Sequence, residues 1–170
     1  MTTNDVLKKL RFAIKLNDAA MLELLAAGGA PAERAQLDAW FLADDAPGYV
    51  DCPRRALAAL LDGLILRERG PRPATDAASP GGSAGKGAGA PEPFLDNNQI
   101  LKKLRIALQL QEGDMIAIMR RAGVELSKSE LSALFRKKGQ KNYQECLDQF
   151  LRNFLAGLAG YQRADTANRS

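Results

Sequence analysis

The sequence predicts an all-α protein made of two homologous four-helix domains, and three observations support this fold class. A segment near the N-terminus recurs 94 residues later in the chain of 170 residues. Apolar side chains recur at helical spacing within each copy. No segment alternates apolar and polar residues between turn residues, as a half-buried strand would. The composition, 46% apolar and 26% charged, is that of an ordinary globular protein.

The internal repeat is ungapped and extends over nearly the whole of each copy. Residues 4–64 aligned with residues 98–158 give 19 identities in 61 pairs. The strongest shared block is Asn-x-[Val/Ile]-Leu-Lys-Lys-Leu-Arg, followed by Tyr-x-[Asp/Glu]-Cys and by Gly-Leu. A match of this length indicates a duplication. We therefore assign residues 1–70 to copy 1 and residues 98–162 to copy 2.

Capping signals give the expected helix limits. In copy 1 the first helix is expected to begin at Asn4 or Thr3, the second at Asn17 or Asp18, the third at Pro31 and the fourth at Pro53. The second helix is expected to end at Gly28-Gly29 and the fourth at Gly70. In copy 2, Ser127 and Glu130 have the spacing of a capping box for the third helix. A copy of this size buries only a small core. We therefore expect the copies to pack on each other about a pseudo-twofold axis, in preference to dimerisation of the chain.

The segments outside the copies are rich in Pro, Gly, Ala and polar residues. Residues 71–97 are therefore expected to form a flexible linker and residues 163–170 a disordered tail, because neither buries enough apolar area to offset its ordering entropy. Residues 81–87 resemble a phosphate-binding loop only superficially. Pro80 and Gly87 stand where that loop requires Gly and Ser or Thr, so the linker interpretation is preferred.

The composition excludes most common catalytic and metal sites. The chain has no histidine and two cysteines, which rules out Ser-His-Asp and Cys-His nucleophiles, histidine-ligated metals and four-thiolate sites. Cys52 and Cys146 are expected in the core, since the preceding Asp51 and Glu145 disfavour a thiolate. The carboxylates are scattered, and Asp62 has Ala156 as its counterpart in copy 2. We therefore predict a protein that is not an enzyme and has no metal and no cofactor.

Five aromatic residues follow helical spacing and are predicted to belong to the core. They are Trp40, Phe41, Phe135, Phe150 and Phe154. The alternative, a platform for stacked bases, is less favoured for this group.

The basic residues are unevenly distributed. The net charge is −1 over residues 1–70 and +6 over residues 98–170, so a polyanion is attracted mainly to copy 2. The candidate nucleic-acid-binding residues are Lys102, Lys103, Arg105, Arg120, Arg121, Arg136, Lys137, Lys138 and Lys141 in copy 2, and Lys8, Arg11 and Lys15 in copy 1. The alternative is a set of solvated helix faces, with Arg120-Arg121 complementing a helix dipole. This alternative is preferred, more strongly for copy 1 than for copy 2.

The ends and the apolar runs bear on location and partners. The N-terminus has no apolar signal region, and the longest apolar stretch, residues 56–66, is about half of what a bilayer requires. We expect a cytoplasmic protein that does not associate with membranes. The favoured function is non-enzymatic binding or regulation, in which helical surfaces bind another macromolecule. One version of it is nucleic acid bound by the basic surface of copy 2. The alternatives are a protein partner or self-association, and then a small enzyme using carboxylate, Tyr or Lys chemistry.

The repeated motifs resemble those of a known bacterial family. Both Asn-x-[Val/Ile]-Leu-Lys-Lys-Leu-Arg blocks, both Tyr-x-[Asp/Glu]-Cys motifs and the segment from Gln149 to Leu158 are similar to the YehS-like family of tandem-domain proteins of unknown function. The resemblance covers both copies, while the linker departs from the pattern. It implies a small bacterial protein that is helical in both halves. It implies no activity and no catalytic residues.

Overall fold

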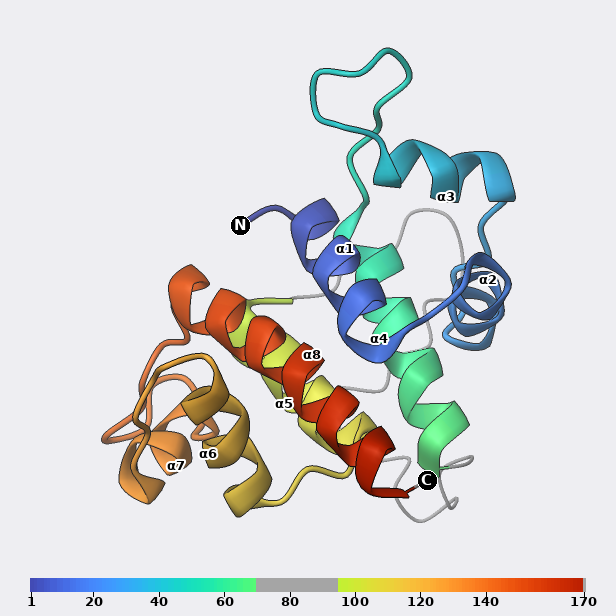
Figure 1. Cartoon of the computed structure of the whole chain (residues 1–170). Coiled ribbons are helices and arrows are strands. Elements are labelled where there is room, and N and C mark those ends of the chain that lie inside the picture. Colours follow the sequence, from blue (N-terminus) through green and yellow to red (C-terminus); the bar gives the residue numbers. More distant parts are fainter. Residues whose placement is uncertain (70–94, 170) are drawn as a thin grey trace.

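The computed structural model describes residues 1–69 and 95–169, and over these residues the fold is all-α, as predicted (Figure 1). The helices are α1 (Thr3–Ile14), α2 (Asp18–Ala27), α3 (Arg34–Phe41), α4 (Arg54–Arg69), α5 (Asn97–Ala107), α6 (Glu112–Arg121), α7 (Lys128–Leu134) and α8 (Asp148–Arg169). No strand occurs within these two ranges. Most of the predicted linker, residues 71–94 with the phosphate-loop-like stretch, lies outside the described residues. Its last three residues, 95–97, are described, and Leu95 is buried and Asn97 begins α5.

The two copies pack on each other about a pseudo-twofold axis. Helices α1, α4, α5 and α8 form the centre of the molecule, with α2 and α3 on one side and α6 and α7 on the other (Figure 1). The first helix of each copy packs mainly on the last helix of the other copy, α1 on α8 and α5 on α4. Apolar side chains of both copies consequently belong to one continuous core.

A buried asparagine at the start of each repeat connects the first helix to the loop before the last helix. Asn4 Nδ2 donates to the carbonyl oxygens of Trp40 and Val50, and its Oδ1 accepts the Cys52 N–H at 2.8 Å. Asn98 makes the same three bonds in copy 2, to Leu134 O, Gln144 O and Cys146 N. The repeated Asn is therefore explained by these three hydrogen bonds, which close the loop onto the core.

Glycine allows the second and fourth helices of each copy to approach closely. A Cβ at Gly63 would lie 2.0 Å from the Leu24 carbonyl oxygen, and one at Gly157 would lie 2.0 Å from the Ile118 carbonyl oxygen. Side chains larger than hydrogen therefore cannot be accommodated at either position without moving the helices apart. This contact accounts for the Gly-Leu block that both copies share.

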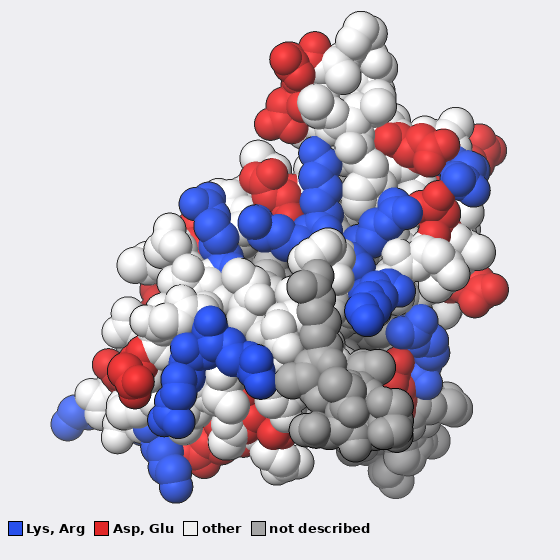
Figure 2. Space-filling view, in the orientation of Figure 1, with Lys and Arg blue, Asp and Glu red and all other residues white. Residues whose placement is uncertain are grey.

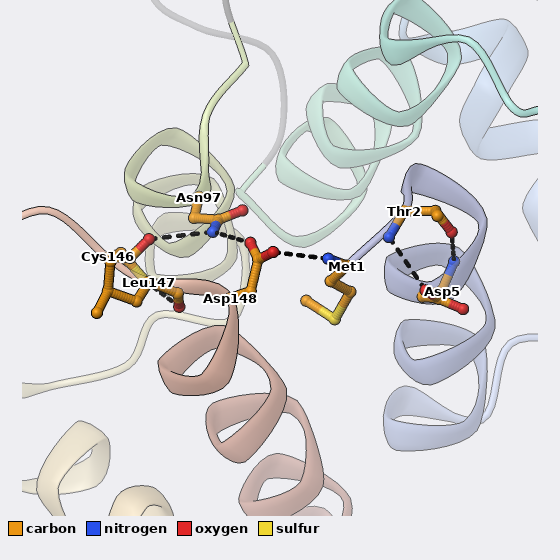
Figure 3. Close-up of polar contacts among 7 residues, drawn as sticks. All are labelled: Met1, Thr2, Asp5, Asn97, Cys146, Leu147 and Asp148. Atoms are coloured by element: carbon orange, nitrogen blue, oxygen red, sulfur yellow. Dashed lines mark hydrogen bonds and ion pairs between the residues drawn. The ribbon is translucent and has the colours of Figure 1, made fainter.

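A polar contact joins the N-terminal ends of α1 and α8 (Figure 3). The Met1 amine donates to Asp148 Oδ2 at 2.6 Å, and Asn97 Nδ2 donates to Asp148 Oδ1 at 2.7 Å. These two partners hold the pKa of Asp148 below its usual value. The contact places the start of copy 1 beside the last helix of copy 2.

Several predicted helix limits are corrected by the structure. Thr2, rather than Asn4 or Thr3, caps α1, because the Asn4 side chain is used inside the core. α3 begins at Arg34 after Glu33, so Pro31 lies ahead of its first turn. Asn17, Gly28 and Ser127 cap their helices as predicted. The backbone of α8 is helical to Arg169, across most of the segment expected to be a tail.

The cysteines and two of the five predicted core aromatics are buried. Cys52 and Cys146 are buried, and burial raises the pKa of each thiol to about 12. Trp40 and Phe154 are also buried. The other aromatic residues predicted to lie in the core are half-buried at its edge, namely Phe41, Phe135 and Phe150.

Candidate nucleic-acid interface

The outward face of α1 carries an exposed aromatic ring among basic side chains. Leu10 and Ala13 point into the core, so Phe12 lies on the opposite side of the helix, and 62% of its surface is exposed. Lys8 and Lys15 lie four residues before and three after Phe12 and therefore flank its ring. Figure 2 shows Lys and Arg side chains gathered over α1 in the middle of this face.

Two shallow hollows adjoin the Phe12 ring, one on each side of α1. The first, of about 430 Å³, lies toward α3 and is lined by Lys8, Arg11, Phe12, Lys15, Leu16 and Phe41. The second, of about 390 Å³, lies toward α8 and is lined by Lys8, Lys9, Phe12, Leu155, Ala156 and Ala159. Lys8 and Phe12 belong to both hollows. An extended ligand that crosses α1 would therefore contact the ring and pass from one hollow into the other.

The basic side chains of α1 differ in how far they are engaged. The Arg11 guanidinium lies 2.8 Å from Asp18 and 4.7 Å from the centre of the Phe41 ring, so its charge is partly compensated. Lys8 Nζ donates to the Leu42 carbonyl oxygen at 2.9 Å and also attracts the Asp5 carboxylate, whose pKa is lowered. Within the described part of the chain, Lys9 and Lys15 have no hydrogen-bond or ion-pair partner.

The equivalent helix of copy 2 carries fewer available charges and no exposed ring. Lys102 is exposed, but Lys103 forms an ion pair with Asp62 of α4. The Arg105 guanidinium stacks 4.7 Å from the Phe135 ring centre and donates to Leu110 O. At the positions of Phe12 and Lys15, copy 2 has Ile106 and Gln109.

The other basic residues predicted in copy 2 lie on α6 and on the loop after α7, away from α1. Arg120 is exposed, 3.9 Å from Glu125, and Arg121 crosses α8 at Gly160, where an added Cβ would lie 3.8 Å from Arg121 Cδ. On the loop, Arg136 Nη1 donates to the Lys141 carbonyl oxygen, and Lys137, Lys138 and Lys141 are exposed. The structure therefore distributes the candidate residues over several elements, and only those of α1 surround a ring.

Sequence reasoning missed Phe12 and Lys9. A signal was present, because Phe12 occupies a position on the polar side of the α1 stripe, where an apolar ring gains nothing from the core. Comparison of the repeats gives a second signal, since Phe12 and Lys15 are replaced by Ile106 and Gln109 in copy 2. The availability of Lys9 depends on the opposing helix, which a one-dimensional pattern does not reveal.

The described residues contain no group of three or more His, Cys, Asp or Glu side chains arranged to hold a metal ion. Among the same residues, no helix combines the length and the apolar character that crossing a bilayer requires. Cys52 and Cys146 are buried away from both hollows' lining residues. The residues that line the two hollows include lysines, one arginine and apolar side chains, and none of them is Cys, Ser, Thr or Tyr.

Comparison with known proteins relates the chain to one family and to one similar protein of full length. The family described as "Protein of unknown function (DUF1456)" matches twice, over residues 3–70 and 97–164. The chain is also similar to the uncharacterized protein YehS of Escherichia coli (strain K12), with 38% identity over 162 residues, which are 95% of this chain and 97% of that protein. No solved structure matches the chain.

Proposed function

We propose that this chain, which belongs to the DUF1456 family of proteins of unknown function, is a non-enzymatic protein that binds single-stranded nucleic acid across α1. The observation that carries the proposal is the exposed Phe12 ring, 62% accessible, flanked by Lys8 and Lys15. Exposed aromatic rings beside lysines are the elements with which proteins bind single strands.

The charge on α1 favours a polyanion. The side chains of Lys9 and Lys15 lack partners among the described residues, and the charge of Lys8 is only partly compensated by Asp5, so positive charge is available along one helix. Neutralising phosphates with such side chains releases counterions, which supplies affinity that falls with salt. An acidic protein surface would satisfy the charges, but it would not use the ring.

The geometry favours a single strand over a duplex. In a duplex the bases are stacked inside the helix, where a ring on the surface of α1 cannot reach their faces. The bases of a single strand are free to stack on an aromatic ring, which is worth about 1–3 kcal/mol per base. The shallow hollows on either side of Phe12 leave room for the neighbouring nucleotides.

Two observations support binding over catalysis. The thiols of Cys52 and Cys146 are buried and have pKa values of about 12, so they are protonated near neutral pH. The lining of the two hollows includes lysines, one arginine and apolar side chains, but no carboxylate and no hydroxyl group.

The test is a fluorescence anisotropy titration with a short labelled oligothymidylate at low salt. We expect the wild-type chain to bind, and Phe12→Ala to weaken binding by about tenfold, the loss of one stacked base. Lys15→Gln should make the slope of log affinity against log salt shallower by about 0.7, the share of one phosphate on a single strand.

Ile106→Ala is the matched control, because it truncates the equivalent side chain of copy 2 and should leave the affinity unchanged. A duplex of the same length should bind more weakly than the single strand. Failure of the wild-type chain to bind either form at low salt would exclude the proposal. Light scattering on the same samples tests the alternative of self-association, which predicts a dimer without nucleic acid.

A further inference from the structure

The two interfaces between the copies are pseudo-equivalent, but an ion pair in one of them has no counterpart in the other. Where α4 packs on α5, the Asp62 carboxylate pairs with Lys103 Nζ. Where α8 packs on α1, the equivalent of Asp62 is Ala156 and the equivalent of Lys103 is Lys9. Lys9 thus has the same place in the fold as a lysine that is paired with an acid, but at the equivalent position of α8 it meets Ala156 instead of an acid.

The same side of α8 is also lined by smaller side chains. Ile65, only 8% exposed on α4, corresponds to Ala159 on α8, and Leu66 corresponds to Gly160. The smaller side chains leave the hollow of about 390 Å³ between Lys9, Phe12 and Ala156. The hollow and the lack of an ion pair at Lys9 therefore both result from the small residues at positions 156, 159 and 160 of α8.

The charged groups around this hollow are mainly positive. Lys8 and Lys9 line it, and Arg152 lies four residues before Ala156, on the same side of α8. The nearest acid on α1 by helical spacing is Asp5, whose carboxylate accepts the Thr2 backbone N–H and attracts Lys8. An anionic group that enters the hollow would therefore be attracted mainly by Lys9, since no residue that lines the hollow carries a carboxylate.

We infer that the hollow between α1 and α8 is a phosphate subsite, in which a strand phosphate takes the place that the Asp62 carboxylate has beside Lys103. This inference rests on the proposed function, and it assigns one contact within it. A phosphate oxygen accepts a hydrogen bond from Lys9 Nζ, while the adjoining base stacks on Phe12. A carboxylate from an acidic peptide would satisfy Lys9, but it would leave most of the hollow and the ring unused.

The decisive variant restores the missing acid. Ala156→Asp places a carboxylate opposite Lys9, as Asp62 lies opposite Lys103, and Ala156 is exposed, so the fold has room for it. We expect Ala156→Asp and Lys9→Gln each to weaken oligothymidylate binding by about tenfold, the loss of one hydrogen bond between charged groups. The double variant should lose less affinity than the product of the two single losses, because both changes remove the same contact.

Two matched controls separate pairing from net charge. Gly113→Asp adds the same charge to α6, where an added side chain meets nothing within 4 Å, and should change the affinity little. Asp62→Ala opens the pseudo-equivalent contact beside Ile106, where no ring is available, and should not weaken binding. Circular dichroism checks that each variant keeps its helices.

The outcomes distinguish this inference from the proposed function. If the wild-type chain binds and Phe12→Ala weakens it, but Ala156→Asp weakens it no more than Gly113→Asp, the subsite is excluded and the proposed function stands. If the wild-type chain does not bind, both fall. If labelled oligoglutamate binds more tightly than oligothymidylate and loses affinity in Ala156→Asp, the hollow receives protein carboxylates and the inference is overturned.

Discussion

The tertiary fold decides the role of Asn4 and Asn98, and not the preference of asparagine for helix N-caps. Asparagine is a common N-cap, and position alone suggests that role for Asn4. In the structure both side chains are buried and make three hydrogen bonds each, one to the last turn of the third helix of the copy and two to the loop that follows it. The loop carbonyls and the cysteine N–H would otherwise be buried without partners, which is costlier than an uncapped helix end.

Replacement of Asn98 by alanine should therefore destabilise the protein by about 2–3 kcal/mol, because buried polar groups of the loop lose their partners. Urea unfolding followed by circular dichroism measures this loss. Asn153→Ala is the control, since Asn153 only accepts a bond from Gln149 near the surface and should change stability by less than about 0.5 kcal/mol. Equal effects of the two substitutions would contradict the structural role of Asn98.

The paired cysteines give a second prediction at the level of single residues. Burial raises the pKa of Cys52 and Cys146 to about 12, so near pH 8 both remain thiols in the folded state. A disulfide reagent such as Ellman's should react with neither thiol in the native protein and with both in denaturing urea. Rapid reaction of either thiol in the native state would show that it is accessible as a thiolate.

Helices of this protein approach each other to different degrees, and glycine sets the closest approach. A Cβ at Gly157 would lie 2.0 Å from the Ile118 carbonyl oxygen, so Gly157→Ala requires α6 and α8 to separate. We expect a loss of about 1–3 kcal/mol, as for other overpacked cores. Gly113→Ala is the control, because open space surrounds it in α6 and alanine should raise stability by up to about 1 kcal/mol. Thermal unfolding of both variants measures the two changes in stability, and a loss at Gly157 no larger than that at Gly113 would contradict the prediction.

The helices themselves follow largely from local sequence, whereas their ends depend on context. Asn17, Gly28 and Ser127 cap where local rules place them, because their interactions span only three or four residues. Pro31 is suited to a first turn, yet α3 starts at Arg34 behind a capping box formed by Glu33 and Gln36. Local chemistry permits a helix start at Pro31 or at Arg34. Contacts with the rest of the fold select Arg34, and local sequence rules do not predict those contacts.

The candidate site was only partly predictable for a related reason. Lys8, Arg11 and Lys15 are recognisable as one face of α1 from their spacing. Whether the charge of a basic residue on α1 is available depends on other elements, since Asp18 compensates Arg11 and α8 places Ala156 rather than an acid beside Lys9. Net charge drew attention to copy 2, but summed charge does not report which lysines are already paired, as Lys103 is with Asp62.

At the scale of the whole molecule, the two copies depend on each other. α1 packs mainly on α8 and α5 on α4, so the principal partner of each first helix belongs to the other copy. Val6, Leu7 and Leu10 of α1 share one core with Leu151, Leu155 and Leu158 of α8. Separation of the copies would expose both faces of these contacts to water, and apolar surface exposed in this way costs about 25 cal/mol per Å².

The last prediction follows from this exchange of partners. Residues 1–70 and 95–170, prepared as separate polypeptides, should each have reduced helicity and no cooperative thermal transition, or should self-associate through the exposed faces. Mixed in equal amounts, they should recover the helicity of the intact chain and sediment as a one-to-one complex, because each half supplies the missing partner of the other. Asp62→Arg should weaken that complex, since it places a positive charge against Lys103. A half that is monomeric and unfolds cooperatively near the stability of the intact chain would show instead that each copy folds on its own helices.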